Sequence, residues 1–70
     1  MKRHNLDDFS RLLKAKRYAS GLSLADLAAR TGVSRQTLWN IETGKDLWLS
    51  TASKIVEHFG GVEAFFGGGA

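Results

Sequence analysis

Apolar residues recur at helical spacing along the chain, and glycines separate the segments in which they do so. The first segment begins near Asn5 or Asp7, whose side chains suit a helix N-terminus, and Gly21 ends it. Its apolar residues fall near one broad helix face: Leu6, Phe9, Leu12, Leu13 and Ala19. No segment alternates with the period that a β-strand needs, so the pattern predicts an all-α domain.

The middle of the chain has the pattern of two short helices joined by a tight turn. Ser23 is placed to cap the first of them, with Asp26 three residues on as a short form of the capping box. Gly32 ends this helix in the left-handed conformation that glycine adopts without steric cost, and Ser34 caps the next helix. This is the helix-turn-helix pattern, predicted over about residues 23–43.

Two further helices are expected toward the C-terminus. The first begins at Ser50 or Thr51 and buries a stripe formed by Ala52, Ile55, Val56 and Phe59. A last short helix covers about residues 62–66 and is apolar on most of its surface.

Length and charge narrow the possibilities further. Seventy residues, 43% of them apolar, fit one small domain, expected over residues 1–66 with a basic mobile arm at 1–4 and a flexible tail at 67–70. The net charge is +3, and eight of the ten basic residues lie within residues 1–35. We therefore expect polyanion binding through the N-terminal half, the alternative being a basic face that only meets water.

The sequence offers no metal or catalytic site. It contains no cysteine, and His4 and His58 are isolated from each other. Serine, histidine and aspartate occur as caps, arm or surface residues, without a nucleophile elbow or a glycine-rich phosphate loop. No apolar run approaches the roughly 20 residues of a membrane span. We expect a cytoplasmic bacterial or phage protein that needs no cofactor and is not an enzyme.

The second helix of the motif presents a polar face. At about 100° per residue, Leu38 and Ile41 point one way, and the opposite face carries Arg35, Gln36, Trp39, Asn40 and Thr43. Arginine can bond O6 and N7 of guanine together, and glutamine or asparagine can bond N6 and N7 of adenine. Because such a helix enters the major groove with its N-terminus first, we predict base contacts by Arg35, Gln36 and, one turn deeper, Asn40. The alternatives are a phosphate contact by Arg35 and a face that only meets water.

Trp39 is the unusual residue on this face, since a large aromatic side chain is costly to leave in water. One interpretation is a base contact, in which the ring packs on a thymine methyl or a sugar. The others are a contact with a partner protein and a ring turned sideways onto Lys45 or the following loop.

Contacts with the DNA backbone are predicted at both ends of the motif. Ser23, Ser34, Thr37 and the free amides at the two helix N-termini are placed to hold phosphate oxygens, and Thr43 is assigned to the backbone as well. Such contacts set the register without reading sequence. The alternative for the two serines is capping alone.

From about Leu12 to Phe59 the chain resembles, without gaps, the lambdoid phage repressor and Cro family of helix-turn-helix regulators, also called the XRE family. The resemblance is carried by Lys16-Arg17, Gly21-Leu22-Ser23, Asp26-Leu27-Ala28, Gly32-Val33-Ser34, Ile41-Glu42 and Gly44-Lys45. Two departures stand out. Leu24 occupies a position where the family usually has glutamine, and Asp46-Leu47-Trp48-Leu49 follows where basic residues or proline are common.

The resemblance implies a compact five-helix bundle, similar to lambda repressor, that binds operator DNA as a homodimer. It implies a DNA backbone contact for Lys45 and a structural ion pair between Arg17 and Glu42, the alternative being two unrelated surface charges. The family places its fifth helix at the two-fold axis. The implied dimer interface is therefore Val62, Phe65 and Phe66, except for any ring that packs back onto its own domain.

Two interpretations of the function follow. The first is a sequence-specific regulator of transcription, a repressor that binds a palindromic operator in double-stranded DNA as a homodimer. The second is a protein-interaction module, such as the antitoxin of a toxin–antitoxin pair, with a co-encoded toxin or another regulatory protein as its partner. The exposed-looking apolar residues favour the second: Leu24, Trp39, Leu47, Trp48 and the C-terminal helix.

Overall fold

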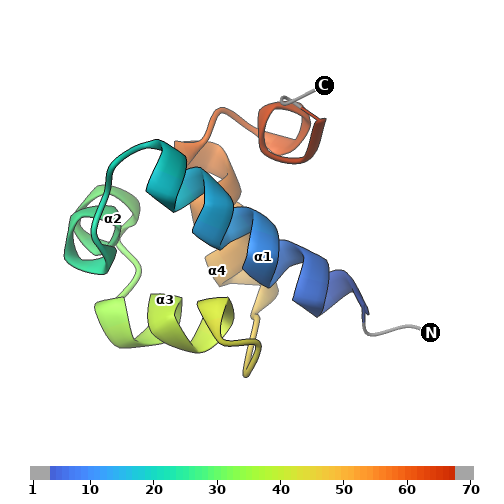
Figure 1. Ribbon diagram of the computed structural model, residues 1–70, viewed down its shortest axis with the longest axis horizontal. Coiled ribbons are helices and arrows are strands. Elements are labelled where there is room, and N and C mark those ends of the chain that lie inside the picture. Colours follow the sequence, from blue (N-terminus) through green and yellow to red (C-terminus); the bar gives the residue numbers. More distant parts are fainter. Residues whose placement is uncertain (1–3, 68–70) are drawn as a thin grey trace.

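The computed structural model describes residues 4–67, and these residues form five helices and no strand. They are α1 (His4–Ala19), α2 (Leu24–Thr31), α3 (Arg35–Glu42), α4 (Leu49–His58) and the π-helical turn η1 (Glu63–Gly67). In Figure 1, α1 crosses in front of α4, with α2 and α3 to one side and η1 near the C-terminus. The expected all-α, five-helix fold is confirmed.

Helix boundaries depart from the prediction at three places. α1 begins at His4, inside the expected arm, whereas residues 1–3 of the arm and 68–70 of the tail lie outside the described residues. α4 begins at Leu49 rather than at Ser50 or Thr51, because the carbonyl of Trp48 already accepts a hydrogen bond from the Ala52 amide at 2.8 Å. η1 includes Gly67, one residue beyond the predicted end.

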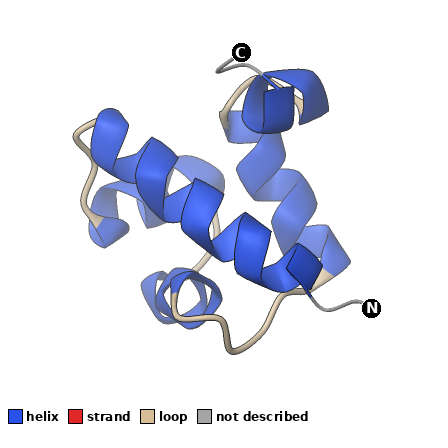
Figure 2. Cartoon of the chain, turned by 45° about the vertical axis from the view of Figure 1, so that its right-hand side comes forward, coloured by secondary structure: helices blue, strands red, loops and turns tan. Residues whose placement is uncertain are grey.

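The hydrophobic core draws on every helix, with fully buried side chains at Leu13, Leu27, Leu38, Ile41, Ile55 and Phe65. The described side chains begin at Asp7, and Phe9 and Leu13 turn inward as predicted. Ala19 is exposed, contrary to the prediction, because α1 ends there and the chain then turns away toward α2. Figure 2 shows how short the connecting turns are; the longest joins α3 to α4 through residues 43–48.

Phe65 attaches η1 to the bundle. Its ring centroid lies 5.0 Å from that of Phe9 and 5.7 Å from that of Phe59, and Lys16 donates a hydrogen bond to the Ala64 carbonyl at 3.3 Å. The placement of Phe65 in a dimer interface is therefore wrong, because this ring packs back into its own core. Val62 and Phe66 remain 66% and 55% exposed.

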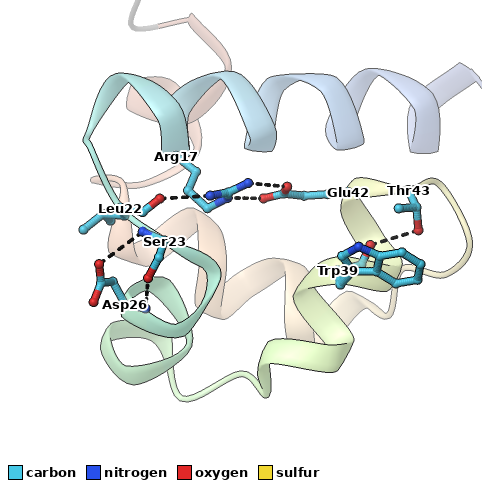
Figure 3. Close-up of polar contacts among 7 residues, drawn as sticks. All are labelled: Arg17, Leu22, Ser23, Asp26, Trp39, Glu42 and Thr43. Atoms are coloured by element: carbon cyan, nitrogen blue, oxygen red, sulfur yellow. Dashed lines mark hydrogen bonds and ion pairs between the residues drawn. The ribbon is translucent and has the colours of Figure 1, made fainter.

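Two polar contacts fix α3 against α1. Arg17 donates to both carboxylate oxygens of Glu42, from Nε at 2.6 Å and from a terminal nitrogen at 2.9 Å, and its other terminal nitrogen donates to the Leu22 carbonyl at 2.9 Å (Figure 3). Both side chains are buried, and the hydrogen bond to Glu42 raises the pKa of the Arg17 guanidinium above its ordinary value. Ser10, also buried, donates to the Ile41 carbonyl. The ion pair is thus present, and it joins the last turn of α1 to the end of α3.

Removing one partner of this pair should destabilise the domain strongly. Glu42→Ala leaves a buried guanidinium without its carboxylate and is expected to cost about 3–5 kcal/mol of unfolding free energy. The Arg17→Met and Glu42→Ala double variant should recover part of that loss, since no buried charge remains.

Denaturant melts of the wild type, both single variants and the double variant test this prediction. The matched control is the exposed pair of Arg11 and Asp8, joined at 3.2 Å, for which Asp8→Ala should cost at most about 1 kcal/mol. Additive losses for Arg17 and Glu42 would contradict the coupling.

Candidate nucleic-acid interface

Local capping shapes the helix-turn-helix as the sequence predicts. The Asp26 amide donates to Ser23 Oγ at 3.0 Å, and the Ser23 amide donates to Asp26 Oδ2 at 3.1 Å, which completes the capping box (Figure 3). Gly32 adopts φ 79° and returns its amide to the Ala28 carbonyl at 2.9 Å. Ser34 then starts α3 by accepting from the Thr37 amide at 3.1 Å.

α3 has one buried face and one exposed face. Leu38, Ile41 and Glu42 are buried, whereas the opposite face comprises Arg35, Gln36, Trp39, Asn40 and Thr43, which we call the α3 outer face. Of these five only Asn40 is partly buried, and Trp39 is 44% exposed. The helix therefore carries its hydrogen-bonding side chains on a surface that the core does not use.

The N-termini of α2 and α3 meet at one surface hollow. The hollow has a volume of about 340 Å³ and is lined by Leu24 from α2 and by Arg35, Gln36 and Trp39 from α3. The free backbone amides at the starts of both helices therefore lie close to the α3 outer face. Helix N-termini attract anions, because these amides and the helix dipole present positive charge.

The hydroxyl groups at the two ends of α3 differ in which hydrogen-bond donors and acceptors remain unused. Ser34 accepts from the Thr37 amide and also donates to Thr37 Oγ1 at 2.8 Å, so its hydrogen is already used. Thr37 accepts that bond and keeps its own hydrogen for another acceptor. Thr43 donates to the carbonyls of Trp39 at 2.9 Å and Asn40 at 3.1 Å, which leaves it only lone pairs.

The indole ring of Trp39 is contacted by Lys45, which follows the C-terminal end of α3. Lys45 Nζ lies 4.9 Å from the centre of the indole ring, a cation–π contact of the kind that the sideways alternative required. The ring also lines the hollow with Leu24, so it contacts Lys45 and still contributes to the surface beside α2.

On the same face of α3, Gln36 Nε2 donates a hydrogen bond to Asn40 Oδ1 at 3.2 Å, which orders both side-chain amides.

Not all of the predicted basic residues are free to meet an anion. Arg17 is buried against Glu42, and Lys16 bonds the Ala64 carbonyl and lies 5.8 Å from the centre of the Phe65 ring. The concentration of positive charge in the N-terminal half therefore overstates its capacity to bind a polyanion.

Within residues 4–67, no group of three or more histidine, aspartate or glutamate side chains is arranged to hold a metal ion. None of the helices in that range is long and apolar enough to cross a membrane.

Sequence reasoning from the residues missed Ser10 and did not assign a site to Leu24. Ser10 follows Phe9 and precedes Leu13 by three positions, so a polar residue inside a core stripe was the available signal. In the sequence, Leu24 stands out as a departure from the family's glutamine and as an apolar residue that favours a protein partner. Its place beside Arg35 and Gln36 is known only from the structure.

The chain belongs to the helix-turn-helix domain family, whose sequence profile matches residues 8–60. Over 51 residues it is 45% identical to a candidate HTH-type transcriptional regulatory protein of Archaeoglobus fulgidus. Over 49 residues it is 43% identical to a second candidate regulator of the same description from Pyrobaculum aerophilum. These matches span 73% and 69% of this chain but only 16% and 20% of the relatives. No solved structure gives a significant match.

Stability should respond to acid through the capping box. The Ser23 backbone amide donates a hydrogen bond to the Asp26 carboxylate, and this bond lowers the pKa of that carboxyl below its ordinary value. A lowered folded-state pKa means that the stabilisation is present above the unfolded-state pKa and is lost as pH falls through the folded-state value. Asp26→Asn should therefore be less stable than the wild type at neutral pH, and the difference should shrink in acid.

Denaturant unfolding at a series of pH values measures that difference. Asparagine keeps an acceptor oxygen but cannot titrate in this range, so the comparison isolates the charge. A difference that stays constant from neutral pH into acid would contradict the prediction.

Proposed function

We propose that this domain binds double-stranded DNA in a sequence-specific manner and acts in the regulation of transcription, with α3 in the major groove. The observation that carries the proposal is the α3 outer face, where hydrogen-bonding side chains are exposed along the second helix of a helix-turn-helix. The description of both relatives as candidate transcriptional regulators agrees with it.

The proposed contacts with DNA bases are made by Arg35, Gln36 and Asn40. Arg35 is exposed in the first turn of α3, where it reaches either guanine or a phosphate. Gln36 spends one amide hydrogen on Asn40 and keeps the second hydrogen and its carbonyl oxygen, which are the two groups that adenine N7 and N6 require. The contact with Asn40 therefore orients Gln36 without using up its reading capacity.

Contacts with the DNA backbone are proposed for the two helix N-termini with Ser23 and Thr37, and for Lys45 beyond the end of α3. Lys45 already lies over Trp39, which holds its positive charge beside the α3 outer face. Ser34 contributes mainly as a cap, because both of its hydrogen-bonding roles are taken within α3. Thr43 is proposed to accept rather than donate, for the same reason.

More specifically, we propose that the domain is a repressor of the lambdoid phage repressor and Cro type and binds a palindromic operator as a homodimer. It is supported by an apolar groove of about 440 Å³ on the surface of α4 and η1, lined among others by Leu49, Val62 and Phe66. Covering such residues with a second copy removes apolar surface from water. With Phe65 used in the core, the interface is small and the dimer weak until DNA holds both halves in register.

A protein partner is the second candidate function, favoured by two exposed apolar side chains at the start of α4. Trp48 and Leu49 are 67% and 85% exposed, and two neighbouring large apolar side chains of that kind are typical of a contact surface. Stable binding to another protein together with weak, sequence-independent DNA binding would favour this candidate, including the antitoxin interpretation.

Selection of bound sites from a random duplex pool tests the proposal as a whole. We expect a palindromic consensus with half-sites about one helical turn apart. Failure to enrich any duplex would contradict sequence-specific binding, and enrichment of a lone half-site would contradict the homodimer alone.

Two substitutions on the same surface should have different effects on DNA binding. Gln36→Ala should weaken binding to the selected duplex by about 1–3 kcal/mol per half-site and leave random DNA nearly unaffected. Lys45→Ala should weaken binding to every duplex and flatten the salt dependence, because it removes one phosphate contact.

Titrations of the selected and a random duplex at several salt concentrations separate the two effects. Lys54→Ala on α4 is the charge-matched control, since it removes the same charge from outside the proposed interface. An unchanged ratio of selected to random binding in Gln36→Ala would overturn its role as a base reader.

Dimer formation should depend on Val62 and Phe66. Phe66→Asp places a charge on an exposed ring position and should give a folded monomer that binds a half-site without preferring the full palindrome. Because Phe66 also contacts the Phe9 and Phe65 rings, Val62→Asp provides a second variant that leaves those rings in place.

Sedimentation with and without the selected duplex reports the number of copies bound, and circular dichroism reports folding. A wild-type protein that saturates a full palindrome with one copy would exclude the dimer.

A further inference from the structure

The hollow between the starts of α2 and α3 is apolar at a place where the surrounding side chains are polar. Leu24 is partly buried and packs against the core with part of its surface, while its remaining surface lines the hollow beside Trp39. Arg35 and Gln36 form the rest of the lining. The hollow thus combines two apolar and two hydrogen-bonding side chains, and three of the four belong to the α3 outer face.

The major groove of DNA presents a limited set of chemical groups to such a surface. Its base edges carry hydrogen-bond donors and acceptors, and the C5 methyl of thymine is the largest apolar group among them. Neither a leucine methyl nor the carbon edge of an indole ring can satisfy a donor or acceptor, so either of them facing those groups would desolvate them at a cost.

We propose that Leu24 and Trp39 together receive the C5 methyl of a thymine, which makes this hollow a specificity-determining site. The proposal rests on the proposed DNA binding and adds one base to what that binding reads. Gln36 stands beside the hollow and is suited to adenine, so the thymine is expected next to an adenine contact.

Two features suit the site to this role. Lys45 over the indole ring restricts the position of Trp39, so less freedom is lost when a base arrives. Leu24 is the first residue of α2, and the capping box formed by Ser23 and Asp26 fixes the backbone on which it stands.

The test replaces thymine by deoxyuridine, one position at a time, in the duplex selected from the random pool. This exchange deletes only the C5 methyl and leaves base pairing unchanged. Burying one methyl group corresponds to about a three- to fivefold change in affinity, so we expect one thymine in each half-site to lose that factor when replaced. Leu24→Ala should bind the thymine and uracil duplexes equally, and Leu24→Met, which keeps an apolar side chain, should still discriminate.

Leu12→Ala is the matched control. Leu12 is likewise partly buried and packed against the core, but it does not line the hollow, so this variant should lose stability and keep the discrimination. Leu24→Gln, of similar length, gives the readout should Leu24→Ala not fold, and it too should bind both duplexes equally.

The outcomes distinguish this site from the proposed function. Enrichment of a duplex in which no thymine exchange weakens wild-type binding overturns the methyl site and leaves DNA binding intact. Discrimination that survives in the Leu24 variants overturns the role of Leu24. Failure to enrich any duplex overturns DNA binding, and the methyl site with it.

Discussion

The buried ion pair between Arg17 and Glu42 is the contact on which the arrangement of the motif depends. α3 is eight residues long and its own hydrogen bonds do not fix its direction, whereas a bidentate pair to α1 fixes both distance and angle. The third bond of Arg17, to the Leu22 carbonyl, ties the same guanidinium to the turn before α2. One side chain thus relates α1, the start of α2 and the end of α3, and a pair this deeply buried contributes geometry more than net stability.

The surface of α3 shows how function and fold share one short helix. Leu38 and Ile41 belong to the core, whereas the hydrogen-bonding side chains lie on the α3 outer face. Several of those groups already bond one another, as Gln36 does with Asn40 and Ser34 with Thr37. Such bonds restrict rotamers before any ligand arrives, so less conformational entropy is lost on binding.

Local signals in the sequence predicted more of the structure than long-range ones did. Ser23, Gly32 and Ser34 each act within three or four residues of themselves, and the structure has all of them in the predicted capping roles. The partner of Arg17 lies 25 positions away and was inferred from a family resemblance, not from any pattern in the chain. The fate of Phe65 was open, because a five-residue turn has no periodicity that separates an inward face from an outward one. Ser10 was missed for a related reason, since a serine at a core position only makes sense once the Ile41 carbonyl opposite it is known.

The shortness of α2 and α3 has a consequence for how the domain responds to its surroundings. Each has eight residues, below the roughly 12–15 that an isolated helix needs to persist in water, so neither exists without the rest of the bundle. Folding and the presentation of the α3 outer face are therefore one cooperative event. A molecule that binds this face binds only the folded domain and therefore, by mass action, raises the melting temperature of the whole domain. Residues far from the contact, including the phenylalanines around η1, are stabilised with it. Thermal stability is in this sense a direct report of occupancy at the opposite side of the molecule.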